Sequence, residues 1–138
     1  MTTQTRKATL RWTGKGLQFE GVGAGPSGIL IDGDSEAGPS PMEVLLLSVG
    51  GCMAVDIQMI LEKGRVPLED LTIGLEGDRA PSSPKRFINL RMTIRVAGPE
   101  ESHRPKVERA VQLSKDKYCS VFHTLQPDLE VETEVHLA

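Results

Sequence analysis

The sequence predicts one α/β (α+β) domain spanning residues 1–138, with the element order β-β-β-α-β-β-α-β. Three observations lead to this prediction. The length of 138 residues is that of one ordinary domain. Segments with alternating apolar and polar residues occur near both ends of the chain and in its middle, as in half-buried strands. A long apolar segment with a capping signal separates the first strands from the later ones, as expected for a central helix.

The N-terminal third of the chain predicts three short strands. Alternation indicates strands over residues 8–12 and 17–22, and the Gly-Lys-Gly sequence at residues 14–16 indicates the turn of a hairpin. A third strand is expected over residues 28–34, where it ends in a turn. The Gly-Pro-Ser-Pro sequence at residues 38–41 then interrupts regular structure.

The start of the central helix is clearly marked. Ser40 is a good N-cap, Pro41 suits the first helical position, and Glu43 stands three residues after the cap. The helix is expected to end near Lys63, with Gly64 as its C-terminal stop. Its first half is apolar almost all round, which predicts a helix buried on most sides.

Two adjacent glycines interrupt this helix just before Cys52. Gly50 and Gly51 each cost roughly 1 kcal/mol in a helix interior. Such a cost suggests that another backbone passes close to the helix at this point.

The C-terminal half predicts strands over residues 71–77, 87–96 and 129–137, and an amphipathic helix from Pro105 to about Tyr118. The middle strand alternates over its whole length. Five of its residues are expected to share one face, namely Phe87, Asn89, Arg91, Thr93 and Arg95. The inner face of the helix is expected to contain Val107, Ala110, Val111 and either Leu113 or Ser114.

Composition argues against several classes of partner. The net charge is −3, basic residues are dispersed, and aromatic residues make up only 4%, so binding to nucleic acid is not expected. The N-terminus leads into an alternating strand instead of a signal segment. The longest apolar run has about a dozen residues and is expected to be too short to cross a bilayer. These features favour a cytoplasmic location without membrane contact.

Cys52 and Cys119 are the only cysteines, and each admits two interpretations. A free cysteine is often a small apolar residue of the core, whereas a pair can also form a redox couple. A chain of this length does not need a disulfide to fold, and two cysteines do not make an all-cysteine zinc site. No metal site and no cofactor is expected, since the usual nucleotide-binding and metalloprotease motifs are absent.

A functional thiol in an apolar pocket needs a cationic or hydrogen-bonding partner, because burial alone raises its pKa. For Cys119, a short helix around residues 120–125 offers its N-terminus to the sulfur. For Cys52, Glu43 lies nine residues earlier, about half a turn away, and is best explained as a capping residue. Asp56, four residues after Cys52, shares its face and would act by holding a cation, or would pair at the surface or with a dimer partner.

The segment Ser-Pro-Met-Glu-Val-Leu-Leu-Leu-Ser-Val-Gly-Gly-Cys at residues 40–52 resembles the OsmC/Ohr family of bacterial organic hydroperoxide reductases. The Tyr-Cys-Ser-Val sequence at residues 118–121 resembles the second cysteine motif of the family, and the first motif is most similar to the YhfA-like branch. The resemblance implies an intertwined homodimer, with sheets wrapped around the central helices and active sites at the interface.

The resemblance also implies an antioxidant, stress-related peroxidase. Cys52 would attack an organic hydroperoxide and become a sulfenic acid, which Cys119 would resolve to a disulfide. A dithiol, typically that of a lipoylated protein, would reduce the disulfide.

The sequence departs from the reductase pattern in two places. The reductases have an Asn-Pro-Glu motif, whereas Met42 stands at its glutamate position and the glutamate is shifted to Glu43. The reductases also activate the thiol with an arginine from the N-terminal strands. In this chain, Arg11 is the only arginine in the predicted N-terminal strands, and Arg86 and Arg91 could approach the thiol from elsewhere in the sheet. Two alternatives therefore remain: a non-catalytic protein that binds a small ligand on the same fold, with the cysteines as core packing, and a structural dimerisation domain.

Overall fold

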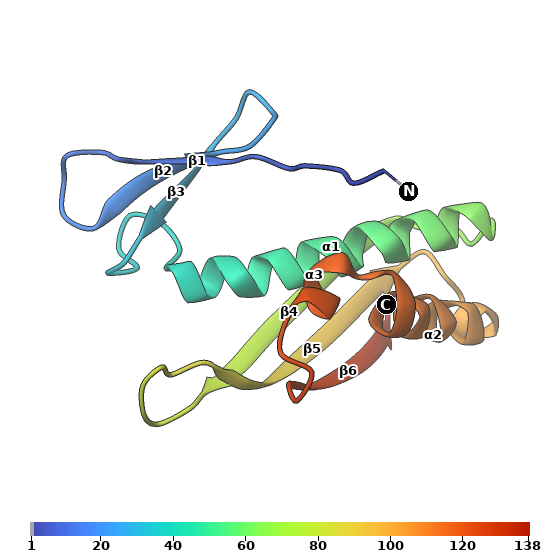
Figure 1. The fold of residues 1–138 in the computed structure, drawn as a ribbon. Helices are drawn as coiled ribbons and strands as arrows, with labels where there is room; N and C mark the ends of the chain where they lie inside the picture. The colour runs from blue at the N-terminus through green and yellow to red at the C-terminus, as the bar shows by residue number, and fades with distance from the viewer. Residues whose placement is uncertain (1) are drawn as a thin grey trace. The chain divides into compact units, whose positions relative to one another are not determined.

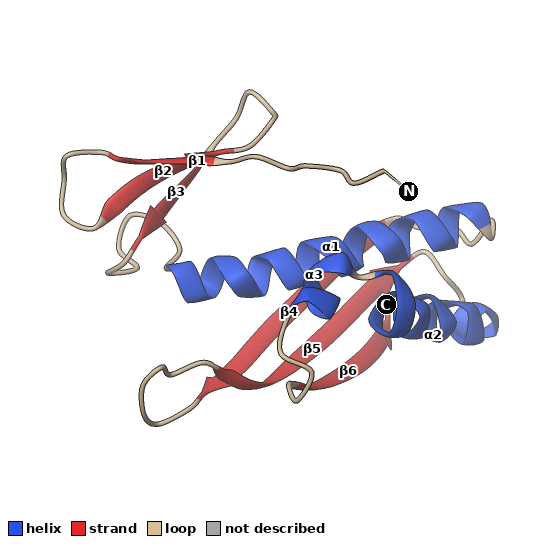
Figure 2. Cartoon of the chain, in the orientation of Figure 1, coloured by secondary structure: helices blue, strands red, loops and turns tan. Residues whose placement is uncertain are grey.

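The computed structural model describes residues 2–138 and confirms the predicted order of strands and long helices (Figure 2). The strands are β1 (Thr9–Trp12), β2 (Gln18–Val22), β3 (Ile29–Asp32), β4 (Asp70–Arg79), β5 (Phe87–Ala97) and β6 (Glu130–Leu137). The α-helices are α1 (Pro41–Lys63), α2 (Arg104–Leu113) and α3 (Ser120–Thr124). The chain forms two compact units, which divide after Leu45.

The first unit contains an antiparallel sheet in the order β1-β2-β3. Asp32, at the end of β3, is 2% exposed and holds the following turn. Its carboxylate accepts hydrogen bonds from the backbone N–H groups of Ala37 and Asp34, both at 2.9 Å. These bonds, chiefly that from Ala37, lower the pKa of Asp32, so the carboxylate is charged at neutral pH.

The predicted capping box at the start of α1 is confirmed. The Ser40 backbone N–H donates to Glu43 Oε1 at 2.9 Å, and the Glu43 N–H donates to Ser40 Oγ at 3.3 Å. The Ser35 hydroxyl donates to the same Oε1 at 2.9 Å. Two otherwise unpaired groups at the helix end are thus satisfied, which locates the start of α1 at Pro41.

The second unit contains a sheet in the order β4-β5-β6, in which β4 and β5 are antiparallel and β5 and β6 are parallel. From Leu46 onward, α1 lies across one face of this sheet (Figure 1). The core combines side chains from one stripe of α1, from β5 and from α2. Its main members are Val49, Met53, Ile57, Leu61, Leu90, Met92, Ile94, Val96, Val107, Ala110 and Val111.

The prediction that Phe87 shares a face with Asn89 and Arg91 is wrong. Phe87 is 8% exposed, and a Cβ added at Gly77 would come within 2.9 Å of both Phe87 and Leu90. The cause is an irregularity in the pairing of β4 with β5, where Asp78 pairs with Asn89 and Arg79 with Phe87. Ile88 is the additional residue of this bulge, and the bulge turns Phe87 toward the core.

The explanation expected for Gly50 and Gly51 also needs correction. A Cβ at Gly50 would lie 2.6 Å from Cδ1 of Leu75, so a side chain of β4, and not a backbone, packs against this glycine. A Cβ at Gly51 meets nothing within 4 Å. Only the first glycine is therefore explained by packing within the described chain.

The face of α1 that contains Gly51 is exposed and apolar. We call it the exposed stripe, which consists of Leu47, Gly51, Val55 and Met59, spaced four residues apart. Contrary to the expectation from the longest apolar run, α1 is long and apolar enough to cross a membrane by length and composition. The core helix of a soluble protein passes the same test, and residues of α1 do pack into a core here.

The second helix ends earlier than predicted. Helix α2 stops at Leu113, and residues Ser114–Tyr118 form a π-helical turn. The Cys119 N–H donates to the Ser114 carbonyl at 2.8 Å, which closes a turn one residue wider than an α-helical turn. Such single π turns often occur at functional sites.

Candidate active site

Cys119 lies where the π-helical turn ends and α3 begins. Its side chain is fully buried, and its sulfur accepts a hydrogen bond from the Phe122 backbone N–H at 3.4 Å. This confirms the expectation that a short helix follows Cys119 and directs an N–H group at its sulfur. Cys119 is therefore the N-cap of α3.

Cys52 is half-buried on α1 and is a neighbour of the Cys119 thiol, whose pKa it helps to raise. The two residues are 67 positions apart in the sequence, and both are free thiols in this structure. Burial raises the pKa of Cys119 to about 11, and the neighbouring Cys52 and Asp56 contribute to this rise. The Phe122 N–H acts in the opposite direction but is outweighed, so Cys119 is protonated at neutral pH.

Asp56 and Ser114 form a polar pair beside the two thiols. The Ser114 hydroxyl donates to Asp56 Oδ2 at 2.7 Å, and the Ser114 side chain is fully buried. Asp56 was expected to hold a cation, but its hydrogen-bonding partner is this neutral hydroxyl. Sequence reasoning missed Ser114 as a site residue, although the periodicity of α2 had placed it among the candidates for the inner face.

A cavity of about 560 Å³ opens next to this pair. Its lining is mainly apolar, with Asp56 and Lys63 as the charged residues. The full lining consists of Asp56, Met59, Ile60, Lys63, Gly64, Leu113 and Tyr118. The cavity shares Asp56 with the polar pair and Tyr118 with the turn that precedes Cys119, but neither cysteine is among its lining residues.

Two of the predicted charge partners belong to the first unit. The carboxylate of Glu43 is engaged by Ser35 and Ser40, which lower its pKa, so its observed role is that of a helix cap. Arg11 lies on β1, opposite Glu20 of β2. The approach of Arg11 to a thiol stays a prediction.

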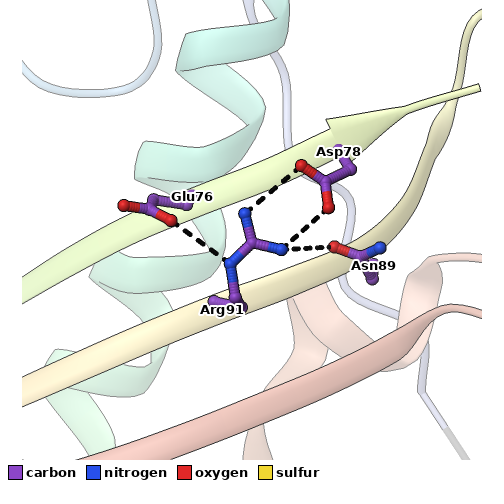
Figure 3. Close-up of polar contacts among 4 residues, drawn as sticks. All are labelled: Glu76, Asp78, Asn89 and Arg91. Carbon is purple, nitrogen blue, oxygen red and sulfur yellow. Dashed lines mark hydrogen bonds and ion pairs between the residues drawn. The ribbon is translucent and has the colours of Figure 1, made fainter.

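The arginines of the second unit pair with carboxylates. Arg91 bonds to Asp78 at 2.8 Å and to Glu76 at 3.2 Å, as Figure 3 shows, and these contacts raise its pKa and lower that of Asp78. Arg91 alternates with the buried Met92, so it lies on the face of the sheet opposite to α1. Arg86 pairs with Asp128 at 2.7 Å. Among residues 2–138, no hydrogen bond or ion pair joins a lysine or arginine to either sulfur.

Comparisons with known proteins agree with this architecture. A family model described as OsmC-like protein matches residues 32–134. Protein YhfA of Escherichia coli K12 is 37% identical over 126 residues, which cover 91% of this chain and 92% of YhfA.

Two solved structures share the fold at low sequence identity. An OsmC-like protein of Mycoplasma pneumoniae has a TM-score of 0.82 at 14% identity, with 99% of both chains covered. An organic hydroperoxide resistance protein of Legionella pneumophila has a TM-score of 0.65 at 13% identity, with 98% of both chains covered. Together with the matched family model and the identity to YhfA, this architecture shows that the chain belongs to the OsmC-like family.

Proposed function

We propose that this protein is a thiol-dependent peroxidase that reduces organic hydroperoxides through a Cys52 sulfenate and a Cys52–Cys119 disulfide. The observation that carries the proposal is the proximity of the two free thiols, which two separate helical segments bring into one neighbourhood. The mainly apolar cavity lined by Asp56 and Tyr118 suits the organic part of a hydroperoxide. A structural neighbour from Legionella pneumophila is named for organic hydroperoxide resistance, which is consistent with this activity.

The proposed cycle has three steps. The Cys52 thiolate attacks the terminal peroxide oxygen, the S–O bond forms, the O–O bond breaks, and the alcohol leaves with a proton. The Cys119 sulfur then attacks the oxidised sulfur, the S–S bond forms, and the hydroxyl group leaves as water. An external dithiol, which we take to be that of a lipoylated protein, finally reduces the disulfide and is itself oxidised.

The difference in exposure between the two cysteines supports the roles proposed for them. Cys52 is half-buried, whereas Cys119 has no exposed surface and has a raised pKa. Because the thiolate is the nucleophile and access is required, peroxide meets Cys52 first. Cys119 then acts as the resolving thiol.

The proposal includes a homodimer in the bacterial cytoplasm. The exposed stripe of α1 supports the dimer, because three large apolar side chains on it are more than half exposed: Leu47, Val55 and Met59. The open space at Gly51 would allow a partner helix to approach closely.

A thiol assay tests the activity. Fully reduced protein is mixed with excess cumene hydroperoxide, and free thiols are counted over time. Two thiols per chain are expected to disappear, and the loss is expected to be abolished in Cys52→Ser. Unchanged thiols in the wild-type protein at excess peroxide would rule out the proposed reaction.

The second candidate is a non-catalytic protein that binds a small ligand. The largely apolar cavity favours it, together with the lack of a lysine or arginine bonded to either sulfur among residues 2–138. This candidate predicts a ligand that co-purifies with the protein, and thiols that survive exposure to peroxide. Mass spectrometry of the native protein, combined with the thiol assay, distinguishes the two.

A further inference from the structure

We infer that Asp56, held in place by Ser114, accepts the proton of the Cys119 thiol when Cys119 attacks oxidised Cys52. This inference rests on the proposed function and concerns its second step. It assigns to Asp56 a role as a base, in place of the cation-holding role expected from the sequence.

The position of Asp56 on α1 is the first argument. Asp56 follows Cys52 by four residues, which places the two side chains on one face of the helix, one turn apart. The Asp56 carboxylate and the Cys52 thiol therefore point to the same side of α1. A hydrogen bond with Ser114 places Asp56 beside the turn that ends at Cys119, and Asp56 is among the groups that raise the pKa of the Cys119 thiol.

The hydrogen bonds of Ser114 are the second argument. Its side chain donates to Asp56 Oδ2 at 2.7 Å, while its backbone carbonyl accepts from the Cys119 N–H at 2.8 Å. One buried residue therefore fixes both the carboxylate and the backbone of the resolving cysteine. Within residues 2–138, this is the only hydrogen bond of the Asp56 side chain, so Oδ1 is available to accept a proton.

The chemistry of the second step requires such a group. Cys119 is buried and protonated, and a thiol is a poor nucleophile until its proton is removed. When Asp56 takes this proton, the Cys119 sulfur forms the S–S bond with Cys52 and the S–O bond of the sulfenic acid breaks. The departing hydroxide takes the proton from Asp56 and leaves as water, so Asp56 returns to its charged form.

A purely electrostatic role of Asp56 would have the opposite effect on the rate of disulfide formation. The influences on the pKa of the Cys119 thiol are its burial, Cys52 and Asp56 of α1, and the Phe122 N–H of α3. Lys63, two turns after Asp56 on α1, also lines the cavity. If Asp56 were only a charge, its removal would lower the pKa of Cys119 and accelerate the attack. If Asp56 is the base, its removal slows the attack.

The experiment compares wild-type protein with Asp56→Asn after rapid mixing with cumene hydroperoxide. Asparagine keeps an oxygen that accepts from Ser114 but does not take the proton. Trapping with dimedone measures the rate of sulfenate formation, which is expected to differ by less than about threefold between the two proteins. Disulfide formation is expected to slow by about 100-fold, the lower range for loss of a general base. Asp116→Asn is the matched control. Asp116 lies on the π-helical turn that contains Ser114, but its side chain is exposed and accepts a hydrogen bond from Gln112.

Two further measurements keep the inference distinct from the proposed activity. Between pH 6 and 8, disulfide formation in Asp56→Asn is expected to rise about tenfold per pH unit, following the thiolate fraction of Cys119, while the wild type is flatter. In a peroxide-free arm, Cys52 is first converted to a mixed disulfide with glutathione, and its displacement by Cys119 is timed. Ser114→Ala is expected to slow this displacement too, by a smaller factor.

The outcomes separate cleanly. Equal or faster disulfide formation in Asp56→Asn, in both arms, would overturn the role of Asp56. Unchanged thiols in the wild-type protein at excess peroxide would overturn the peroxidase proposal. In that case, slower displacement of glutathione by Cys119 in Asp56→Asn than in the wild type would still support Asp56 as the base of thiol exchange.

Discussion

The hydroxyl of Ser114 donates a 2.7 Å hydrogen bond to the carboxylate of Asp56, although the two residues are 58 positions apart. This bond ties α1 to the turn that presents Cys119. The candidate site is thus held by a polar contact as well as by apolar packing, and its geometry depends on both.

Removing this bond is expected to destabilise the protein. Ser114→Ala should lower the free energy of unfolding by about 1–3 kcal/mol, because a buried donor to a charged group is lost. Urea denaturation measures the change. Gln112→Ala is the control, because it removes an exposed hydrogen bond of 2.7 Å to Asp116. It should change the free energy of unfolding by less than about 0.5 kcal/mol. Equal effects of the two variants would contradict the importance of the buried bond.

Replacing the resolving thiol should stop the cycle at its first intermediate. In Cys119→Ser, peroxide should consume one thiol per chain and leave a sulfenate on Cys52 that dimedone traps, because no second sulfur is available to displace the hydroxyl. Intact-protein mass spectrometry records the adduct. In the wild type, the adduct should appear only transiently. Loss of no thiol in this variant would mean that Cys52 is not the first sulfur to react.

Two glycines of β4 should respond differently to alanine. A Cβ at Gly77 would lie 2.7 Å from the Phe87 ring, whereas a Cβ at Gly74 would lie 3.9 Å from Thr93. Gly77→Ala should therefore destabilise the protein by about 1–3 kcal/mol through overpacking. Gly74→Ala should be neutral or slightly stabilising. Similar denaturation midpoints for the two variants would contradict the packing of Phe87 on Gly77.

A charge in the exposed stripe should dissociate the proposed homodimer. Val55 is 56% exposed, and Val55→Lys would bury a charge in the expected interface, so the variant should sediment as a monomer at concentrations where the wild type is a dimer. Ile88→Lys is the matched control, because Ile88 is 40% exposed on the bulge of β5. A dimeric Val55→Lys would exclude this stripe from the interface.

The helix cap should make part of the stability depend on pH. The folded-state pKa of Glu43 lies below its ordinary value of 4.5, chiefly because of the Ser40 N–H. A lowered pKa means that the charged form stabilises the folded state above pH 4.5, and that this stabilisation is lost as the pH falls through the folded value. Glu43→Gln should therefore show a shallower loss of stability between pH 5 and pH 3 in thermal unfolding. An unchanged slope would remove Glu43 from the acid response.

The features predicted correctly from the sequence are those written in neighbouring residues. The capping box of Ser40 and Glu43 spans four positions, and it located the start of α1. The alternation of β6 and the short helix after Cys119 are equally local. The pairing of the two thiols was implied by family resemblance, not by local pattern.

The features that escaped prediction depend on long-range contacts. The bulge at Ile88 preserves the local alternation in composition but changes which side chains face the core. The packing of Leu75 against Gly50 joins segments 25 positions apart, and nothing near Gly50 identifies its neighbour. The partner of Asp56 was missed for the same reason, since a hydroxyl 58 positions away has no local signature.

The π-helical turn before Cys119 makes this short segment intolerant of changes in length. Deleting Lys115, Asp116 or Lys117 from this turn would allow ordinary helix to continue, and Cys119 would rotate by about 100° around the helix axis. The sulfur would then leave Cys52 while every side chain of the site remained in the sequence. We therefore expect a relative that keeps both cysteines but lacks this extra residue to have separated thiols.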